Sequence, residues 1–167
     1  MREFARGSFS LSGAPRRLRL IYTGFLLLVT LGVASQLGFE IGRIGLSAPA
    51  IATYYRGGES GDTMTFPKTF GQLLEVTHAH AFVMAVVFLI LAHLFVATPV
   101  SDTVKTVLLA MTFAGTVGDV LAPWLVRYVS AAFAWITLGS WVAQGLGTAV
   151  MIAVSAWSCL GPREGRV

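Results

Sequence analysis

The sequence predicts an all-α integral membrane protein built as a four-helix transmembrane bundle, and three observations support this prediction. Hydrophobic residues make up 55% of the 167-residue chain. Charged residues make up only 12%, about half the share of a typical soluble domain. Four stretches are apolar over the roughly 20 residues that cross a bilayer. A lipid bilayer is therefore an expected partner, and a soluble globular fold and a disordered chain are excluded.

The four expected spans contain few charges. The first covers residues 20–39, which include no Asp, Glu, Lys or Arg. The other spans cover residues 73–97, 106–126 and 131–157. The connections that follow the second and third spans are short. These three helices are therefore expected to be antiparallel neighbours.

The chain outside the spans divides into three segments. Residues 1–19 form a basic N-terminal segment, and residues 158–167 form a C-terminal tail. Residues 40–70 form an outer loop within the transmembrane domain of residues 20–157. Eight of the 12 Lys and Arg residues fall on the side that holds both termini. The positive-inside rule then predicts cytoplasmic termini in a bacterial inner membrane, and it explains the basic charge without a nucleic-acid partner.

Five ionisable side chains inside the expected spans are the candidate functional residues: Glu75, His78, His80, His93 and Asp119. Ionisable groups in a bilayer are costly and usually face a bundle interior or a cavity. At about 1.5 Å per residue, Asp119 and the first two histidines share a level in the outer half of the bilayer. Asp119 is therefore expected to form an ion pair or hydrogen bond with the second span, or to be neutralised by Arg127 two turns later.

The directions of the three histidines separate them into two sets. At about 100° per residue, Glu75 and His93 fall to the same side of His78. These three residues form one polar stripe on the second span. His80 points about 200° away from His78. We therefore expect His80 to face another helix, a second subunit or the lipid headgroups.

The polar stripe predicts a haem b site or a position close to a quinone. Neutral imidazole is a good axial ligand of haem, so His78, His93 and His80 are the candidate cofactor ligands. A bis-histidine haem needs histidines from two helices, and the other three spans have none. A homodimer or Met111 would supply the second ligand. The expected function is then a membrane subunit of respiratory or photosynthetic electron transfer.

Three alternative interpretations use the same residues. A metal site would combine His78, His80, Glu75 and Asp119, because Glu-x-x-His is the spacing found in di-iron bundles. Carboxylates and histidines that line a cavity also form proton relays. The third alternative is hydrogen bonding inside the bundle with no bound ligand.

Two segments of the sequence carry a resemblance to known proteins. The stretch from Leu18 to Val29, followed by Gly32, and the later Thr77-His-Ala-His-Ala-Phe resemble small, uncharacterised bacterial four-helix membrane proteins. This resemblance implies the fold and no activity. Glu75-x-x-His78 also resembles the helix start of haem-handling units such as haem A synthase. In those proteins an arginine follows the histidine, and here Ala79 takes that position.

A non-catalytic accessory subunit that stabilises a larger membrane complex is the alternative function. Gly38-x-x-x-Gly42 and Ala143-x-x-x-Gly147 place small residues at the spacing that allows close helix packing. Gln144, near the middle of its span, is expected to bond a neighbouring helix. A homo-oligomer or a place in a membrane complex is therefore expected.

Overall fold

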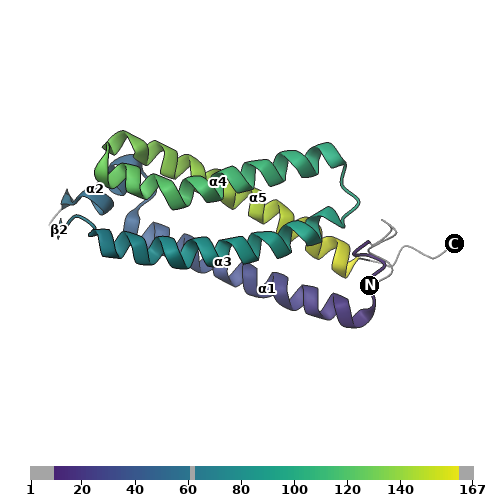
Figure 1. Cartoon of the computed structure of the whole chain (residues 1–167). Coiled ribbons are helices and arrows are strands. Elements are labelled where there is room, and N and C mark those ends of the chain that lie inside the picture. Colours follow the sequence, from purple (N-terminus) through teal and green to yellow (C-terminus); the bar gives the residue numbers. More distant parts are fainter. Residues whose placement is uncertain (1–9, 61–62, 162–167) are drawn as a thin grey trace.

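The protein folds as a bundle of four long helices. The computed structural model describes residues 10–60 and 63–161, so parts of the predicted terminal segments and outer loop lie outside the described residues. The bundle, drawn in Figure 1, consists of α1 (Arg16–Phe39), α3 (Phe70–Val96), α4 (Asp102–Tyr128) and α5 (Ala134–Leu160). Each helix is long and apolar enough to cross a membrane. The predicted all-α transmembrane bundle is therefore confirmed.

The connection from α1 to α3 carries structure of its own. It contains the π-helix η2 (Glu40–Ile44), helix α2 (Ala48–Arg56) and the short strands β1 (Gly58–Ser60) and β2 (Thr63–Thr65). The strands pair antiparallel, with Gly58 opposite Thr65. A Cβ on Gly57 would lie 2.7 Å from the Pro67 ring, and its φ of 79° also requires glycine. We call this end of the bundle the hairpin end.

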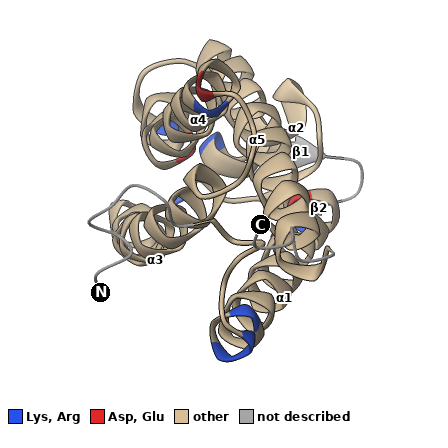
Figure 2. Ribbon diagram, turned by 90° about the vertical axis from the view of Figure 1, so that its right-hand side faces the viewer, with Lys and Arg blue, Asp and Glu red and all other residues tan. Residues whose placement is uncertain are grey.

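The opposite end of the bundle holds both described termini, and we call it the terminal end. Arg19 near the start of α1 donates from Nη2 to the carbonyl of Gly161, at 3.1 Å. The amide of Leu11 donates to the carbonyl of Ala97 beyond α3, at 3.2 Å. Figure 2, viewed from this end, shows basic residues at the start of α1, where the sequence has Arg16, Arg17 and Arg19. The first and last described residues of the chain therefore lie at the same end of the bundle, as four spans require.

Helices α4 and α5 make the closest contact in the bundle, and a short 3₁₀ turn, η3 (Ala131–Phe133), leads into α5. A Cβ on Gly115 of α4 would lie 2.7 Å from the backbone nitrogen of Gln144 on α5. Gly147 of α5 packs directly against Thr112 of α4. The predicted packing role of Gly147 is confirmed. Gly38 has no described atom outside its own helix within 4 Å of an added Cβ.

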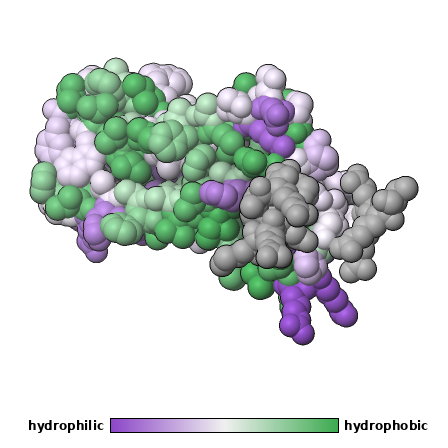
Figure 3. Space-filling view, turned by 45° about the vertical axis from the view of Figure 1, so that its right-hand side comes forward, coloured by the Kyte–Doolittle hydropathy of each residue, from purple (hydrophilic) through white to green (hydrophobic). Residues whose placement is uncertain are grey.

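The outer faces of the helices are apolar. Leu20 is 75% exposed and Phe82 is 70% exposed. Figure 3 shows one face of the molecule, largely hydrophobic, with hydrophilic side chains projecting near the terminal residues. Such a surface suits contact with lipid, whose tails are as apolar as these side chains. The chain is therefore a multi-pass membrane protein.

Candidate functional site

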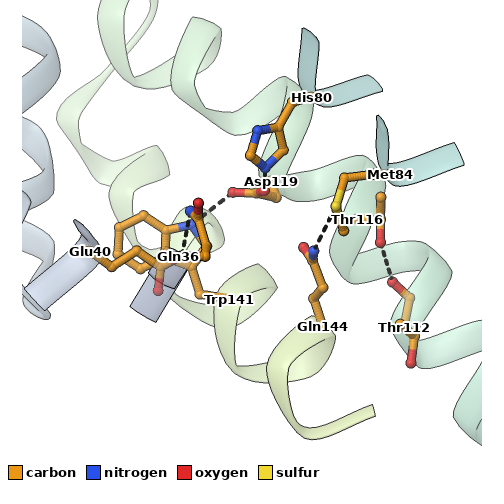
Figure 4. Close-up of polar contacts among 9 residues, drawn as sticks. All are labelled: Gln36, Glu40, His80, Met84, Thr112, Thr116, Asp119, Trp141 and Gln144. Carbon is orange, nitrogen blue, oxygen red and sulfur yellow. Dashed lines mark hydrogen bonds and ion pairs between the residues drawn. The ribbon is translucent and has the colours of Figure 1, made fainter. Parts of the chain in front are cut away.

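A polar pair joins α3 and α4 inside the bundle. The Nε2 atom of His80 lies 3.3 Å from Oδ2 of Asp119 (Figure 4). The side chain of Asp119 is 12% exposed, and that of His80 is 29% exposed. Of the three environments expected for His80, the structure shows another helix, and the bond expected between Asp119 and the second span is present. The pair carries a full ionic interaction when His80 is protonated.

Trp141 on α5 also forms a hydrogen bond with Asp119. Its indole Nε1 donates a hydrogen bond of 2.7 Å to Oδ1 of Asp119. Each carboxylate oxygen therefore has a partner, one from α3 and one from α5. Sequence reasoning did not single out Trp141, because nothing in the spacing of one tryptophan among four marks it as a carboxylate partner. Its presence makes the site a junction of three helices.

The polar pair lies on the wall of a cavity of about 420 Å³ at the hairpin end. We call it the hairpin-end cavity. Helices α1, α2, α3, α4 and α5 all contribute to its lining. Its polar lining residues are Gln36, Tyr54, Tyr55, Lys68, Gln72, Glu75, Thr77, His80, Asp119 and Trp141. Its volume is in the range of sites that hold small organic ligands.

The cavity is open on one side. Four of its lining residues are exposed: Phe39 on α1, by 45%, and Gln72, Glu75 and Val76 on α3, with Val76 exposed by 61%. These residues lie on facing helices, so the opening is between α1 and α3. Both helices could cross a membrane. A ligand could enter this opening from the bilayer or from its surface.

Helix α2 and the segment after the hairpin cover the end of the cavity. Lys68 places Nζ 4.0 Å from the ring centroid of Tyr54. Tyr55 contacts Tyr54 edge to face, with centroids 5.0 Å apart. Burial raises the pKa of the Tyr55 phenol, and the Asp119 carboxylate raises it further. Tyr55 therefore keeps its proton at neutral pH and remains a hydrogen-bond donor at the cavity wall.

A third carboxyl group, besides those of Asp119 and Glu75, lies close to the cavity. Glu40, in the π-helix η2, is only 8% exposed. Its Oε1 accepts a hydrogen bond of 2.9 Å from Nε2 of Gln36, and Gln36 lines the cavity. Short π-helical segments often occur at functional sites. Glu40 lies at the start of the predicted outer loop, and no pattern in the sequence predicts a role for it.

The predicted polar stripe lies on the outer face of α3. Glu75, His78 and His93 are all exposed. Glu75 borders the cavity, whereas His78 packs against Phe82 with ring centroids 5.5 Å apart. The Nδ1 atom of His93 lies 2.7 Å from the Leu89 carbonyl of the same helix. Of the candidate residues that the structure describes, only His80 and Asp119 form a polar contact with each other, and Glu75 borders the same cavity.

The residues predicted as metal ligands do not converge. Within residues 10–60 and 63–161, no group of three or more His, Cys, Asp or Glu side chains could hold a metal ion. The reason is the direction of the side chains on one helix: His80 points to α4, whereas His78 lies on the exposed face. Metal binding by His78, His80, Glu75 and Asp119 stays a prediction with no such cluster to support it.

These features define a class of protein: a multi-pass helical membrane protein with a ligand-sized cavity at one end. A family described as a transmembrane helical domain, Aq_1264_TM, has a model that matches residues 45–166, and the chain belongs to this family. No curated protein and no solved structure matches the chain. The matched region begins before α2 and includes His80, Asp119 and Trp141. Family membership agrees with the resemblance of the sequence to small four-helix membrane proteins.

Proposed function

We propose that the protein is a quinone-binding subunit of a membrane electron-transfer complex, with the quinone head group in the hairpin-end cavity. One observation carries this proposal: the His80–Asp119 pair lines a ligand-sized cavity with both apolar and polar walls, and this cavity opens between two helices that are long enough to cross a membrane. A quinone is an apolar molecule with two carbonyl oxygens and lives in the bilayer. It needs a cavity that combines apolar walls with polar groups in fixed places.

His80 is the residue that exchanges a hydrogen bond with the head group. Asp119 contacts Nε2 of the His80 ring, which leaves Nδ1 of His80 for the ligand. Protonated Nδ1 donates to a quinone carbonyl, and neutral Nδ1 accepts from a quinol hydroxyl. Asp119 stabilises the imidazolium, and Trp141 holds Asp119 in place. The two electrons pass between the quinone and a redox centre of a partner subunit.

The proposal includes an orientation. The sequence assigns eight of the 12 Lys and Arg residues to the side predicted to hold both termini, so the terminal end faces the cytoplasm of a bacterial inner membrane. The hairpin-end cavity then lies in the outer half of the bilayer. A proton that leaves a quinol at His80 would be released on the outer side. Reporter fusions at the C-terminus and in the hairpin test this orientation.

Binding of defined quinones to the full-length protein in lipid nanodiscs tests the function. Decylubiquinone and menaquinone-4 are titrated separately while tryptophan fluorescence is recorded, because Trp141 borders the cavity. We expect saturable quenching by at least one of them. His80→Ala and Asp119→Asn should each weaken binding about tenfold or more, since loss of one well-formed polar contact to a buried group costs 1–3 kcal/mol.

His93→Ala is the matched control for His80→Ala. It removes the same side chain from the same helix, but His93 is exposed and bonds its own helix. Its quinone affinity should equal that of the unaltered protein. The proposal fails if neither quinone binds the folded protein. It also fails if His80→Ala and His93→Ala behave alike.

Haem b binding by His78 and His93 stays a prediction. Both side chains are exposed on α3, so a bis-histidine haem would need a ligand from another copy or another subunit. A reduced-minus-oxidised visible spectrum of the purified protein tests it. A sharp α-band in the b-type region that disappears in His78→Ala or His93→Ala would establish haem. A featureless spectrum from folded protein would remove this prediction.

A non-catalytic accessory subunit is the second candidate. The observation that favours it is the open face of α1, where Gly24, Gly32 and Gly38 have no described atom outside their own helix within 4 Å of an added Cβ. Small residues on a membrane helix allow a partner helix to approach closely. Cross-linking in native membranes from a cysteine placed at Gly32 would show the partner, or a second copy. No adduct from this position would remove this candidate.

A further inference from the structure

A second hollow in the protein begins next to the polar pair. It is an apolar groove of about 270 Å³ between α3 and α4. Ala81 directly follows His80 on α3, and Val120 directly follows Asp119 on α4, and both line the groove. Val120 also lines the hairpin-end cavity, so the two spaces share one lining residue. We call this hollow the α3–α4 groove.

The α3–α4 groove runs from the polar pair towards the middle of the bundle. On α3 it extends from Ala81 to Phe88, which is about 10 Å at the rise of an α-helix. The rings of Phe88 and Phe113 meet at its far end, with centroids 5.9 Å apart. The groove therefore follows the direction in which a lipid-soluble chain would lie if its head group were near His80.

The polar atoms at the wall of the groove are already used within the protein. The hydroxyl of Thr116 donates to the carbonyl of Thr112 on its own helix, at 2.9 Å. Met84 receives the side-chain amide of Gln144 from α5, with a distance of 3.9 Å between Nε2 and Sδ (Figure 4). This contact confirms the bond predicted for Gln144. The groove therefore presents hydrocarbon to its occupant and offers no site for a polar group.

We propose that the α3–α4 groove holds the hydrocarbon tail of the quinone whose head group occupies the hairpin-end cavity. This inference rests on the proposed function and adds the substrate class, a quinone that carries a prenyl or alkyl tail. Two features support this occupant: the groove begins one residue from the polar pair, and its wall is apolar. A tail that leaves between α1 and α3 is the competing arrangement.

Two probes that share one head group test the inference on the full-length protein in nanodiscs. The first is 2,3-dimethoxy-5-methyl-1,4-benzoquinone, which has no tail, and the second is decylubiquinone. Ala85 lines the groove, so Ala85→Phe would fill it. This variant should weaken decylubiquinone binding about tenfold, as expected for losing about two buried methylenes. Binding of the tailless quinone should stay unchanged.

Ala79→Phe is the matched control. Ala79 is exposed on the same helix and lines neither the groove nor the cavity. It should leave the binding of both probes unchanged. Since all variants are measured in the same nanodiscs, each probe partitions equally into the bilayer in every measurement. Comparison between variants therefore isolates the contact with the tail.

The possible outcomes separate the tail site from the head site. Weaker binding of decylubiquinone alone in Ala85→Phe supports the groove. Unchanged binding of decylubiquinone overturns it, and so does an equal loss for both probes. If neither probe binds the unaltered protein, the proposed function fails and the inference fails with it. Should Ala85→Phe not fold, a tail-labelled photoreactive quinone must label Met84, Phe88 or Phe113 in the unaltered protein, and labelling confined to α1 overturns the inference.

Discussion

Arg56 and Arg127 donate hydrogen bonds in opposite directions across the contact between the hairpin end and α4. Arg56 on α2 donates from Nη1 to the carbonyl of Val126, at 2.9 Å. Arg127 on α4 donates from Nε to the carbonyl of Lys68, at 2.8 Å. The last carbonyls of a helix lack partners within it, so Arg56 also caps α4. These two hydrogen bonds hold α2 and the segment after the hairpin, which cover the cavity, against the bundle.

Replacing Arg127 with alanine should loosen this cover. The change leaves the Lys68 carbonyl without its charged donor, which costs about 1–3 kcal/mol for a group that is partly buried. We expect a lower Tm and faster backbone hydrogen exchange in residues 63–69. Arg43→Ala is the control, because Arg43 is an exposed arginine near the same end. Equal exchange in both variants would contradict the fastening role.

The bond from Trp141 to Asp119 predicts a second stability effect. Trp141→Phe keeps an aromatic ring but removes the donor, which leaves Oδ1 of a largely buried carboxylate without its partner. We expect destabilisation of about 1–3 kcal/mol, measured by thermal unfolding in detergent. Trp135→Phe makes the same change on the same helix at a side chain that is 67% exposed, and should have little effect. If both variants melt alike, the bond does not stabilise the fold.

The fold was predictable from the sequence because the length of an apolar stretch is fixed by the thickness of a bilayer. The match in depth between His80 and Asp119 was also predictable, since it follows from helical rise alone. Both predictions depend on distances along a helix. Neither depends on which neighbour a side chain meets.

The direction in which each face of α3 points was harder to predict. In a soluble helix the apolar face marks the core, but in a membrane helix both the bundle and the lipid are apolar. The sequence therefore did not determine whether the stripe of Glu75, His78 and His93 faces the bundle or the lipid. In the structure the stripe lies on the exposed face of α3. The cover of the cavity depends on long-range contacts such as Arg56 to Val126, separated by 70 positions. No local pattern encodes such a contact.

The close contact of α4 with α5 predicts opposite effects for two glycines. An added Cβ at Gly115 would meet backbone atoms of Ser140 and Gln144 at 2.9 and 2.7 Å, and these cannot move aside without shifting a helix. Gly115→Ala should therefore destabilise the protein by about 1–3 kcal/mol. Gly139→Ala on α5 meets no described atom outside its helix within 4 Å and should be neutral or stabilising by up to about 1 kcal/mol. Thermal unfolding of both variants checks this sign difference.

Burial of Tyr55 predicts how stability changes at alkaline pH. Burial, with a further contribution from Asp119, raises the pKa of the Tyr55 phenol above its ordinary value of about 10. The unfolded chain then loses this proton first, so the free energy of unfolding falls as pH rises above about 10. Tyr55→Phe should reduce this loss, whereas Tyr22→Phe, at the other end of the bundle, should keep it. Thermal unfolding from pH 8 to 11 measures the difference, and equal slopes in the two variants would refute the assignment to Tyr55.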